Sequence, residues 1–377
     1  MSKDKQKYNN KLNMNKKQIL KDKQQYKRQN AKKNLIIEQP KPNWALMLPL
    51  LFIVAILPLI VRIHEYETPL SEFSWFSYSN VYVDVFLYYK QWSFISVCLI
   101  MVLIIAVKAY LDRSVLKFSP IFIPLAVYAL LALLSSILSK YRSYSFTGIF
   151  EQFESVFVLL GYCLVVYYIF LFVKNESDVK LLVNGLLIGT IVLGILGLTQ
   201  FLGYDFFATE FGLKLITPRI YWHSLDSIIF TFGKNRVYSS LYNPNYVGVY
   251  VALVLPILIV LTIFNRNLKM VPLYLLAIVG MIISLVGSQS TAGMFTIFVA
   301  IILTAILFWR YILKYFYLTI PFILLIVASI TLINKNHDYY FTNQLKEVID
   351  IEKSQPALTD IQTLDDEIVV TYKGNDL

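Results

Sequence analysis

The residues best suited to chemistry lie where a long polar loop meets an apolar run, at Asn243-Pro244-Asn245. Asn243 suits the N-cap of a helix because its side-chain oxygen can accept a backbone N–H of the first turn, and Pro244 suits the first helical position, where no N–H is needed. The helix would direct its partially positive end towards the outer interface, and Arg236 would lie seven residues upstream. A helix N-terminus beside a guanidinium group is suited to binding phosphate or pyrophosphate. A simpler interpretation stays open, in which Asn-Pro-Asn only starts a membrane span and Arg236 binds lipid phosphate.

Two loops carry further groups that could hold an anion or accept a proton. These loops, residues 203–244 and 140–154, supply two more cations, Arg219 and Arg142. They also supply three groups that could act as a base or bind a hydroxyl: His223, Glu151 and Glu154. Taken alone, residues 140–154 are equally typical of a solvated turn, and His223 of an interfacial side chain. The sequence contains no Cys/His metal spacing, P-loop or Gly-x-Ser-x-Gly elbow. It therefore predicts neither a metal nor a nucleotide cofactor.

The elements that must position these groups are membrane spans. The 377 residues are 57% hydrophobic and 15% charged, whereas a soluble domain carries about a quarter charged residues. Recurrent apolar runs, each of about 20 residues, predict an all-α polytopic membrane protein with about nine transmembrane helices in residues 44–333. We place these spans near residues 44–63, 92–110, 119–139, 154–173, 182–202, 245–264, 270–288, 292–309 and 316–333. The composition excludes a soluble enzyme, a disordered scaffold and a disulfide-stapled secreted module.

The formal net charge of +10 belongs entirely to residues 1–43, which contain 13 Lys/Arg and three Asp/Glu. This tail has no apolar face at helical spacing, and we expect it to be a disordered cytosolic segment that touches anionic lipid. It has no folded module for nucleic acid, so the expected partner is the lipid bilayer. Loops on the same side as the tail hold nine Lys/Arg in 28 residues, against seven in 82 on the other side. This contrast predicts a cytosolic N-terminus.

The predicted span interiors contain no Asp, Glu, Lys, Arg or His. Ion-coupled transporters usually keep such a group at mid-membrane, so this pattern disfavours transport. The ionisable groups gather instead in the loops predicted to lie outside. The longest of these, residues 203–244, shows no secondary-structure pattern of its own, and a connection of that length is more often functional than accidental. We therefore expect the function to lie at the external membrane surface.

The stretch Arg236-Val-Tyr-Ser-Ser-Leu-Tyr-Asn-Pro-Asn-Tyr-Val-Gly, followed by a span with Pro256, resembles the O-antigen ligase/polymerase superfamily. In that family an external Arg shortly precedes an Asn-Pro-Asn helix start. Two other segments are similar to the family: Phe146-Thr-Gly-Ile-Phe-Glu-Gln-Phe-Glu154 resembles its Gly…Glu loop, and Gly287-Ser-Gln-Ser-Thr-Ala-Gly293 lies where it has a Ser-Arg-Gly or Ser-Arg-Ala-Gly hairpin. The resemblance covers residues 44–333.

The resemblance implies a GT-C-like membrane glycosyltransferase of the bacterial cell envelope. Such enzymes move a glycan from a polyprenyl-pyrophosphate carrier to a saccharide or cell-surface acceptor at the outer face, without metal or nucleotide. Because a glycosyl pyrophosphate already has a good leaving group, the enzyme chiefly needs cations for the departing charge and a base for the acceptor hydroxyl. The resemblance implies Arg236 as the pyrophosphate clamp, Arg219 or Arg142 as a second cation, His223, Glu151 or Glu154 as alternatives for the base, and Asn243, Asn245 and Glu154 as substrate-binding residues.

The C-terminal residues 334–377 contain four Lys and nine Asp/Glu, a balance suited to an external domain. Residues 367–372 predict a strand and residues 373–376 a turn. A strand without a partner is not stable alone, so we expect an incomplete extracellular segment, truncated before the family's C-terminal Arg/Trp helix. Two alternative functions stay open. One is a small-anion or polysaccharide-precursor transporter, which needs a polar path through the bundle, and the other is an inactive membrane fragment.

Overall fold

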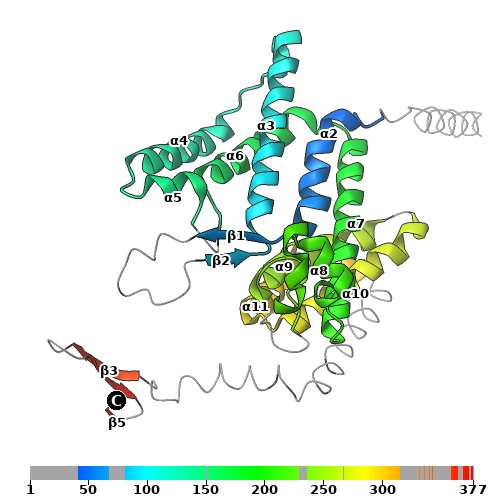
Figure 1. Ribbon diagram of the computed structural model, residues 1–377. Coiled ribbons are helices and arrows are strands. Elements are labelled where there is room, and N and C mark those ends of the chain that lie inside the picture. The colour runs from blue at the N-terminus through cyan, green and yellow to red at the C-terminus, as the bar shows by residue number, and fades with distance from the viewer. Residues whose placement is uncertain are drawn as a thin grey trace, which may run out of the picture.

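The computed structural model describes residues 41–67, 81–149, 152–228, 236–265, 267–314, 358–363, 368–372 and 375–376, with Thr331, Lys335, Tyr339 and Thr342 in addition (Figure 1). The α-helices are α2 (Trp44–Leu51), α3 (Tyr88–Leu111), α4 (Ile123–Leu138), α5 (Arg142–Thr147), α6 (Val156–Phe172), α7 (Glu176–Phe201), α8 (Glu210–Ile216), α9 (Pro244–Phe264), α10 (Val271–Ser288), α11 (Thr291–Leu307) and α12 (Trp309–Lys314). The strands are β1 (His64–Glu67), β2 (Val81–Asp84), β3 (Leu358–Thr363), β4 (Ile368–Tyr372) and β5 (Asn375–Asp376). The short helices are η1 (Phe52–Ile56), η2 (Leu57–Leu59), η4 (Arg113–Val115), η5 (Pro120–Phe122), η6 (Phe206–Ala208), η7 (Arg219–Ser227) and η8 (Leu268–Met270).

Five helical segments are long and apolar enough to span a membrane: Tyr88–Leu111, Pro120–Leu138, Glu176–Phe201, Pro244–Phe264 and Leu268–Ser288. Three shorter apolar helices, Trp44–Leu59, Val156–Phe172 and Thr291–Leu307, lie where the sequence predicts the first, fourth and eighth spans. These findings support an integral membrane protein. The ninth predicted span, residues 316–333, and residues 1–40 of the tail lie outside the described residues, apart from Thr331.

Two helices begin earlier than the apolar pattern predicts, and a polar cap explains each difference. Helix α3 begins at Tyr88 rather than residue 92 because the carboxylate of Asp84 accepts the N–H groups of Leu87 and Tyr88 at 2.9 and 2.8 Å. Helix α7 begins at Glu176 rather than residue 182 because Asn175 and Asp178 form a capping box. Such caps satisfy the free N–H groups of the first turn, so a helix can extend beyond its apolar run.

The larger of the two main cores lies between α7, α9, α10 and α11. It is built from Leu, Val, Ile, Ala and Met side chains with Tyr274. Close backbone contact tightens it: a Cβ added at Gly248 would lie 2.5 Å from Ser290 Oγ and 3.0 Å from the Cα of Gly293. Ser290 caps α11 by accepting the N–H of Gly293 at 3.1 Å. The turn expected at residues 287–293 is short, since α10 ends at Ser288 and α11 begins at Thr291. The expectation that these two helices form a tight hairpin is wrong, because α10 packs on α7 and α9 and α11 packs on α9.

A second core joins α2, α3 and α6, around Met47, Met101 and Tyr168. The hydroxyl of Tyr168 donates to Leu46 O at 2.9 Å, which ties the last third of α6 to the first turn of α2. In Figure 1, α2, α3 and α7 run side by side, and α4 and α6 extend to one side of them. Helix α7 also contacts α2 and α10, so it connects the two cores.

The loops predicted to lie outside meet at one end of the bundle. Strands β1 and β2 form an antiparallel hairpin, which the sequence analysis did not predict, with His64 opposite Asp84. Backbone hydrogen bonds of 2.8 Å join Arg62 N to Val85 O and Ile63 N to Ile216 O. Segments distant in sequence therefore form one polar cap over the helix ends on this side.

Two expectations about loops are wrong. The long loop 203–244 contains secondary structure, namely η6, α8 and η7, and Thr209 caps α8 by accepting the N–H of Gly212 at 3.1 Å. Strand β4 confirms the strand expected at residues 367–372, but it has partners: β3 before it and β5 after it form an antiparallel sheet with it. The expected turn at residues 373–376 contains β5, at Asn375–Asp376.

Replacing Gly248 by Val should destabilise the protein because the added side chain would collide with Ser290 Oγ and the backbone of Gly293. Overpacking of this kind costs about 1–3 kcal/mol. Thermal unfolding of the purified protein in detergent should show a lower Tm. The matched control is Leu253→Val on the same helix, where the side chain is 67% exposed. Equal melting temperatures for both variants and the natural protein would contradict this packing.

Candidate functional site

A cavity of about 740 Å³ opens where α3, α6, η1, η2 and the start of α9 come together. Its wall inside the bundle is apolar and is formed by Ile53, Leu57, Phe94, Val158, Val165 and Val166. Its polar lining comes from Lys90, Gln91, Gln152, Glu154, Tyr162 and Tyr246. The cavity is therefore amphipathic, with one cation and one carboxylate in the described part of its lining.

Lys90 is the third residue of α3 and is partly buried. Its ammonium donates to Ser240 O and lies 5.8 Å from the centre of the Phe86 ring. Among the described residues it forms no ion pair, although the buried carboxylate of Asp84 attracts it. A cation in the first turn of a helix also opposes the positive end of the helix dipole. The position is electrostatically costly for a lysine with a purely structural role.

Gln91 links α3 to the loop before α6. Its side chain is 5% exposed, and its Nε2 donates to Thr147 O at 2.8 Å and to Ser155 Oγ at 3.0 Å. Its Oε1 is buried without a hydrogen-bond partner. Buried acceptors are nearly always paired in folded proteins, so this atom marks a place where a donor from outside the described chain would be accommodated.

A tight turn brings Glu154 to the cavity. Gly148 has φ +90°, and a Cβ at this position would lie 2.8 Å from the backbone of Phe153. Glycine is the residue that tolerates both conditions. The turn leaves Glu154 in the cavity lining, together with Tyr162. The end of the Gly…Glu stretch that the sequence analysis singled out therefore lies at the cavity.

The segment from Val237 to Ser240 is buried, and the side chain of Gln200 on α7 binds its middle. Gln200 Oε1 accepts the N–H groups of Tyr238 and Ser239 at 3.2 and 2.7 Å, and its Nε2 donates to Ser239 O at 3.2 Å. Three backbone groups of one short segment are thus satisfied by a single amide. The segment connects Arg236 to the helix start at Pro244, so Gln200 determines where both lie.

Further bonds fix the ends of this segment. Val237 N donates to Gly287 O at 2.8 Å, and Ser240 Oγ donates to Pro58 O at 2.7 Å. The hydroxyl of Tyr238 donates to the carboxylate of Asp205. Burial, together with that carboxylate, raises the pKa of Tyr238. The hydroxyl therefore stays protonated and acts as a donor.

Unusual backbone angles cluster around the cavity. Five non-glycine residues in the described chain have positive φ, and three of them, Phe153, Ser239 and Tyr242, lie in the two segments that flank it. Such conformations cost of order 1–3 kcal/mol each and concentrate at functional sites. Their grouping here supports the assignment of this region as the candidate site.

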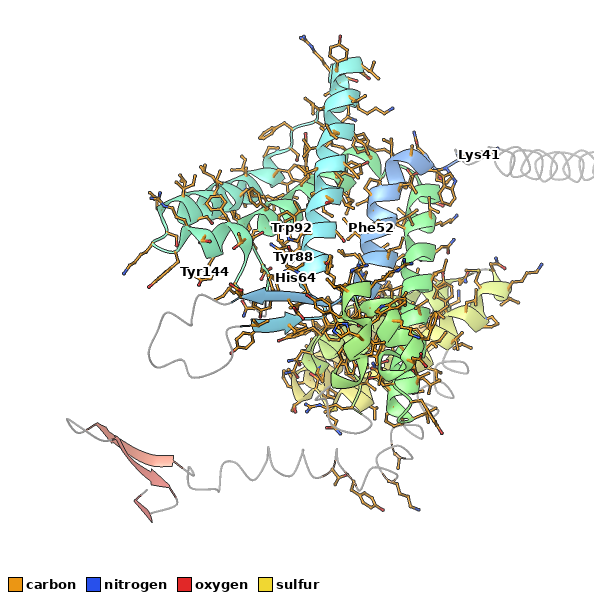
Figure 2. The ribbon with its side chains drawn as sticks, in the orientation of Figure 1. Lys41, Phe52, His64, Tyr88, Trp92 and Tyr144 are labelled. Atoms are coloured by element: carbon orange, nitrogen blue, oxygen red, sulfur yellow. The ribbon has the colours of Figure 1, made fainter. Side chains whose placement is uncertain are left out.

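The β1–β2 hairpin adds an aromatic and ionisable group beside the start of α3. His64 stacks on Tyr88, with ring centroids 3.4 Å apart, and Figure 2 shows the two side chains next to each other at the end of the helix. Burial lowers the pKa of His64 below its ordinary value of 6.5, although the carboxylates of Asp84 and Glu65 oppose this shift. Burial raises the pKa of Asp84, although the N–H groups that it caps and Lys90 act in the opposite direction.

The helix start predicted from Asn-Pro-Asn is confirmed. Asn243 is the N-cap of α9, its side chain accepts the N–H of Asn245 at 2.9 Å, and Pro244 occupies the first helical position. Asn245 is exposed, and the following Tyr246 lines the cavity. The block that carries the family resemblance therefore contributes to the cavity through Tyr246.

The other predicted site residues take different positions. Glu154 lines the cavity, whereas Arg142, Arg219, Arg236 and His223 are exposed and are not among the described lining residues. Arg142 begins α5, Arg219 begins η7 with its guanidinium 5.8 Å from the centre of the Trp222 ring, and His223 lies in η7. Arg236 directly precedes the buried segment held by Gln200. Glu151 lies outside the described residues. The joint action of the three arginines on one diphosphate stays a prediction.

Sequence analysis missed Lys90, which it counted as one external charge before a span beginning at residue 92. A signal was present in the pair Lys90-Gln91 directly before an apolar run, where a cation would meet the positive end of a helix. Gln200 gave no local signal, because its three partners lie 38 and 39 residues away. In the described part of the chain no group of His, Cys, Asp and Glu is arranged to hold a metal ion.

Comparisons of this chain with protein-family models, with curated proteins and with solved structures find no match in any of the three. The argument for function therefore rests on the chemistry of the site.

Replacing Gln200 by Leu should destabilise the protein strongly, because the N–H groups of Tyr238 and Ser239 would stay buried without an acceptor. Each buried unsatisfied group costs about 1–3 kcal/mol. Thermal unfolding in detergent should show a clear fall in Tm. The matched control is the neighbouring Thr199→Val, since Thr199 Oγ1 bonds only Leu196 O in its own helix. If both variants melt alike, Gln200 does not hold the segment.

Proposed function

We propose that this protein is a membrane glycosyltransferase that transfers or polymerises glycan from a polyprenyl-pyrophosphate carrier onto a saccharide acceptor, as the resemblance to O-antigen ligases and polymerases implies. The observation that carries the proposal is the amphipathic cavity beside the start of α9. It combines an apolar wall inside the bundle with Lys90, Glu154 and Tyr246 near its polar end. A lipid-linked sugar phosphate has the matching distribution of apolar chain, anion and hydroxyl groups.

The reaction requires little of the protein beyond charged groups held in the right positions. The acceptor oxygen forms a bond to the anomeric carbon of the donor, the bond from that carbon to the pyrophosphate oxygen breaks, and the pyrophosphate leaves on its lipid. A base takes the acceptor proton, and cations hold the departing negative charge. Glu154 is the described carboxylate of the cavity lining and is our choice for the base. Arg236, at the end of the segment held by Gln200, is our choice for the cation on the pyrophosphate.

The extent of the cavity favours transfer over transport. A transporter needs a polar path from one side of the bundle to the other. Along α3 the lining ends at Phe94, the seventh of 24 residues, and along α6 it ends at Val166, the eleventh of 17. The last third of either helix supplies no lining residue. The cavity accordingly serves a reaction at one membrane surface.

The proposal includes the membrane setting. We infer nine transmembrane helices in a GT-C-like arrangement in a bacterial cell membrane, with a cytosolic N-terminus. The support is the charge contrast between the two sets of loops and the gathering of the predicted external loops around one polar cap. The donor carrier and the acceptor then meet at the external surface.

Replacing Arg236 by Lys should reduce transfer by about 100-fold or more, since Lys keeps the charge but loses the two-pronged contact with a diphosphate. The assay is glycan transfer from a polyprenyl-pyrophosphate-linked oligosaccharide in proteoliposomes. Arg113→Lys, in the short helix η4 at the other end of α3, is the control and should leave transfer unchanged. Normal transfer by the Arg236 variant would remove Arg236 from the site.

Replacing Glu154 by Gln should lower kcat by about 100-fold with a small effect on the KM of the donor, because removal of a general base typically costs 10²–10⁴-fold. The measurement is the pH profile of kcat in the same assay. The natural protein should be faster than the variant at every pH of that profile. A variant that keeps the kcat of the natural protein would show that another group is the base.

A further inference from the structure

We propose that the cavity binds the phosphate group of a polyprenyl phosphate, with the Lys90 ammonium holding the phosphate and the apolar wall receiving the first part of the chain. The identity of the chain rests on the proposed function. The inference goes beyond it by assigning an anion site to a lysine that is separate from the three predicted arginines.

The ammonium of Lys90 would be stabilised by a bound anion, because the described chain leaves two of its N–H groups without an acceptor. Its ammonium has three N–H donors, and the described chain supplies one acceptor, Ser240 O. Asp84, the attracting carboxylate, already accepts two N–H groups of the α3 start and forms no ion pair with Lys90. A partly buried charge without a close partner is costly unless a ligand completes its contacts. A phosphate oxygen supplies both charge and acceptor.

A second observation independently points to a ligand. Gln91, the neighbour of Lys90 and also part of the lining, has a buried Oε1 with no hydrogen-bond partner among the described residues. An acceptor of this kind is satisfied by a hydroxyl group and not by a bare phosphate dianion. A sugar attached to the phosphate offers such a hydroxyl. A glycosylated polyprenyl phosphate therefore matches both side chains. Its phosphate is the anion for Lys90, and its sugar hydroxyl is the donor for Gln91.

The apolar wall identifies the remainder of the ligand. Eight of the lining side chains are Ile, Leu, Val or Phe, and six of them belong to helices of the bundle. Burial of apolar surface contributes about 25 cal/mol per Å², and free phosphate would gain none of it. Binding should therefore depend on the chain as well as on the phosphate, and it should increase when the first isoprene units are present.

The test measures binding of polyprenyl monophosphate to the purified full chain in detergent, by calorimetry or fluorescence. Lys90→Met should weaken binding by about tenfold or more, since a hydrogen bond to a charged group is lost. The matched control is Lys108→Met in the last turn of the same helix, which should bind as the natural protein does. Lys90→Arg keeps the charge and should retain most of the affinity. Melting temperatures of all variants report whether each one folds.

Val166→Trp gives a second test that is independent of Lys90. Val166 lines the cavity and is 49% exposed, so a larger side chain there can narrow the cavity without disturbing the cores. This variant should lose affinity for the polyprenyl phosphate. The site is overturned if Lys90→Met binds the lipid phosphate as tightly as the natural protein. It is overturned equally if inorganic phosphate or phosphatidylglycerol binds as well as the polyprenyl phosphate.

The two proposals fail in different ways. Arg236→Lys should abolish transfer while leaving binding of polyprenyl monophosphate unchanged. If the natural protein binds polyprenyl phosphate through Lys90 and transfers no glycan from any tested donor, the transferase proposal fails and the lipid-phosphate site stands. If transfer proceeds normally in Lys90→Met, the site assigned here fails and the transferase proposal stands.

Discussion

The side-chain amide of Gln200 is the interaction on which the loop end of this protein depends. It satisfies three backbone groups of Tyr238 and Ser239 and is itself 3% exposed. Backbone groups that enter an apolar bundle must find partners inside the protein, because lipid offers none. With the segment fixed in this way, Ser240 O faces the ammonium of Lys90 and Asn243 can cap α9. The helix start and the position of Arg236 therefore depend on this contact, together with the bonds from Val237, Tyr238 and Ser240 to their own partners.

The cavity lies between two groups of helices that pack in different ways. The unit of α7, α9, α10 and α11 brings backbones into direct contact at Gly248 and Gly293, as small residues permit in helix pairs within a membrane. The unit of α2, α3 and α6 is packed through larger side chains such as Met101 and Tyr168. Where the two units separate at the loop end, polar side chains fill the lining. An amphipathic ligand suits such a boundary because neither a uniformly polar nor a uniformly apolar molecule matches both surfaces.

The sequence predicted features that depend on neighbours along the chain. Asn243 and Pro244 indicated a helix start, and the helix begins there. The Ser-rich stretch at residues 287–293 indicated a break between two helices, and Ser290 caps the second of them, although the two helices do not pack on each other as a hairpin. The apolar runs indicated the helices, with errors at their ends where Asp84 and the Asn175–Asp178 capping box extend α3 and α7. Among the residues predicted for the site, Glu154 lines the cavity, and its role stays a prediction.

What the sequence determined by itself is the class of structure and its polarity: apolar runs that exclude a soluble fold, a basic tail, and ionisable groups kept out of the interiors of the apolar runs. What only the tertiary structure decided is which of those polar groups meet. Lys90 and Ser240 are 150 residues apart, and Gln91 and Ser155 are 64 apart. Periodicity and capping act over a few residues and carry no information about such pairs. The packing of the helices brings these groups together, because each buried polar group requires a partner that only the folded chain can place beside it.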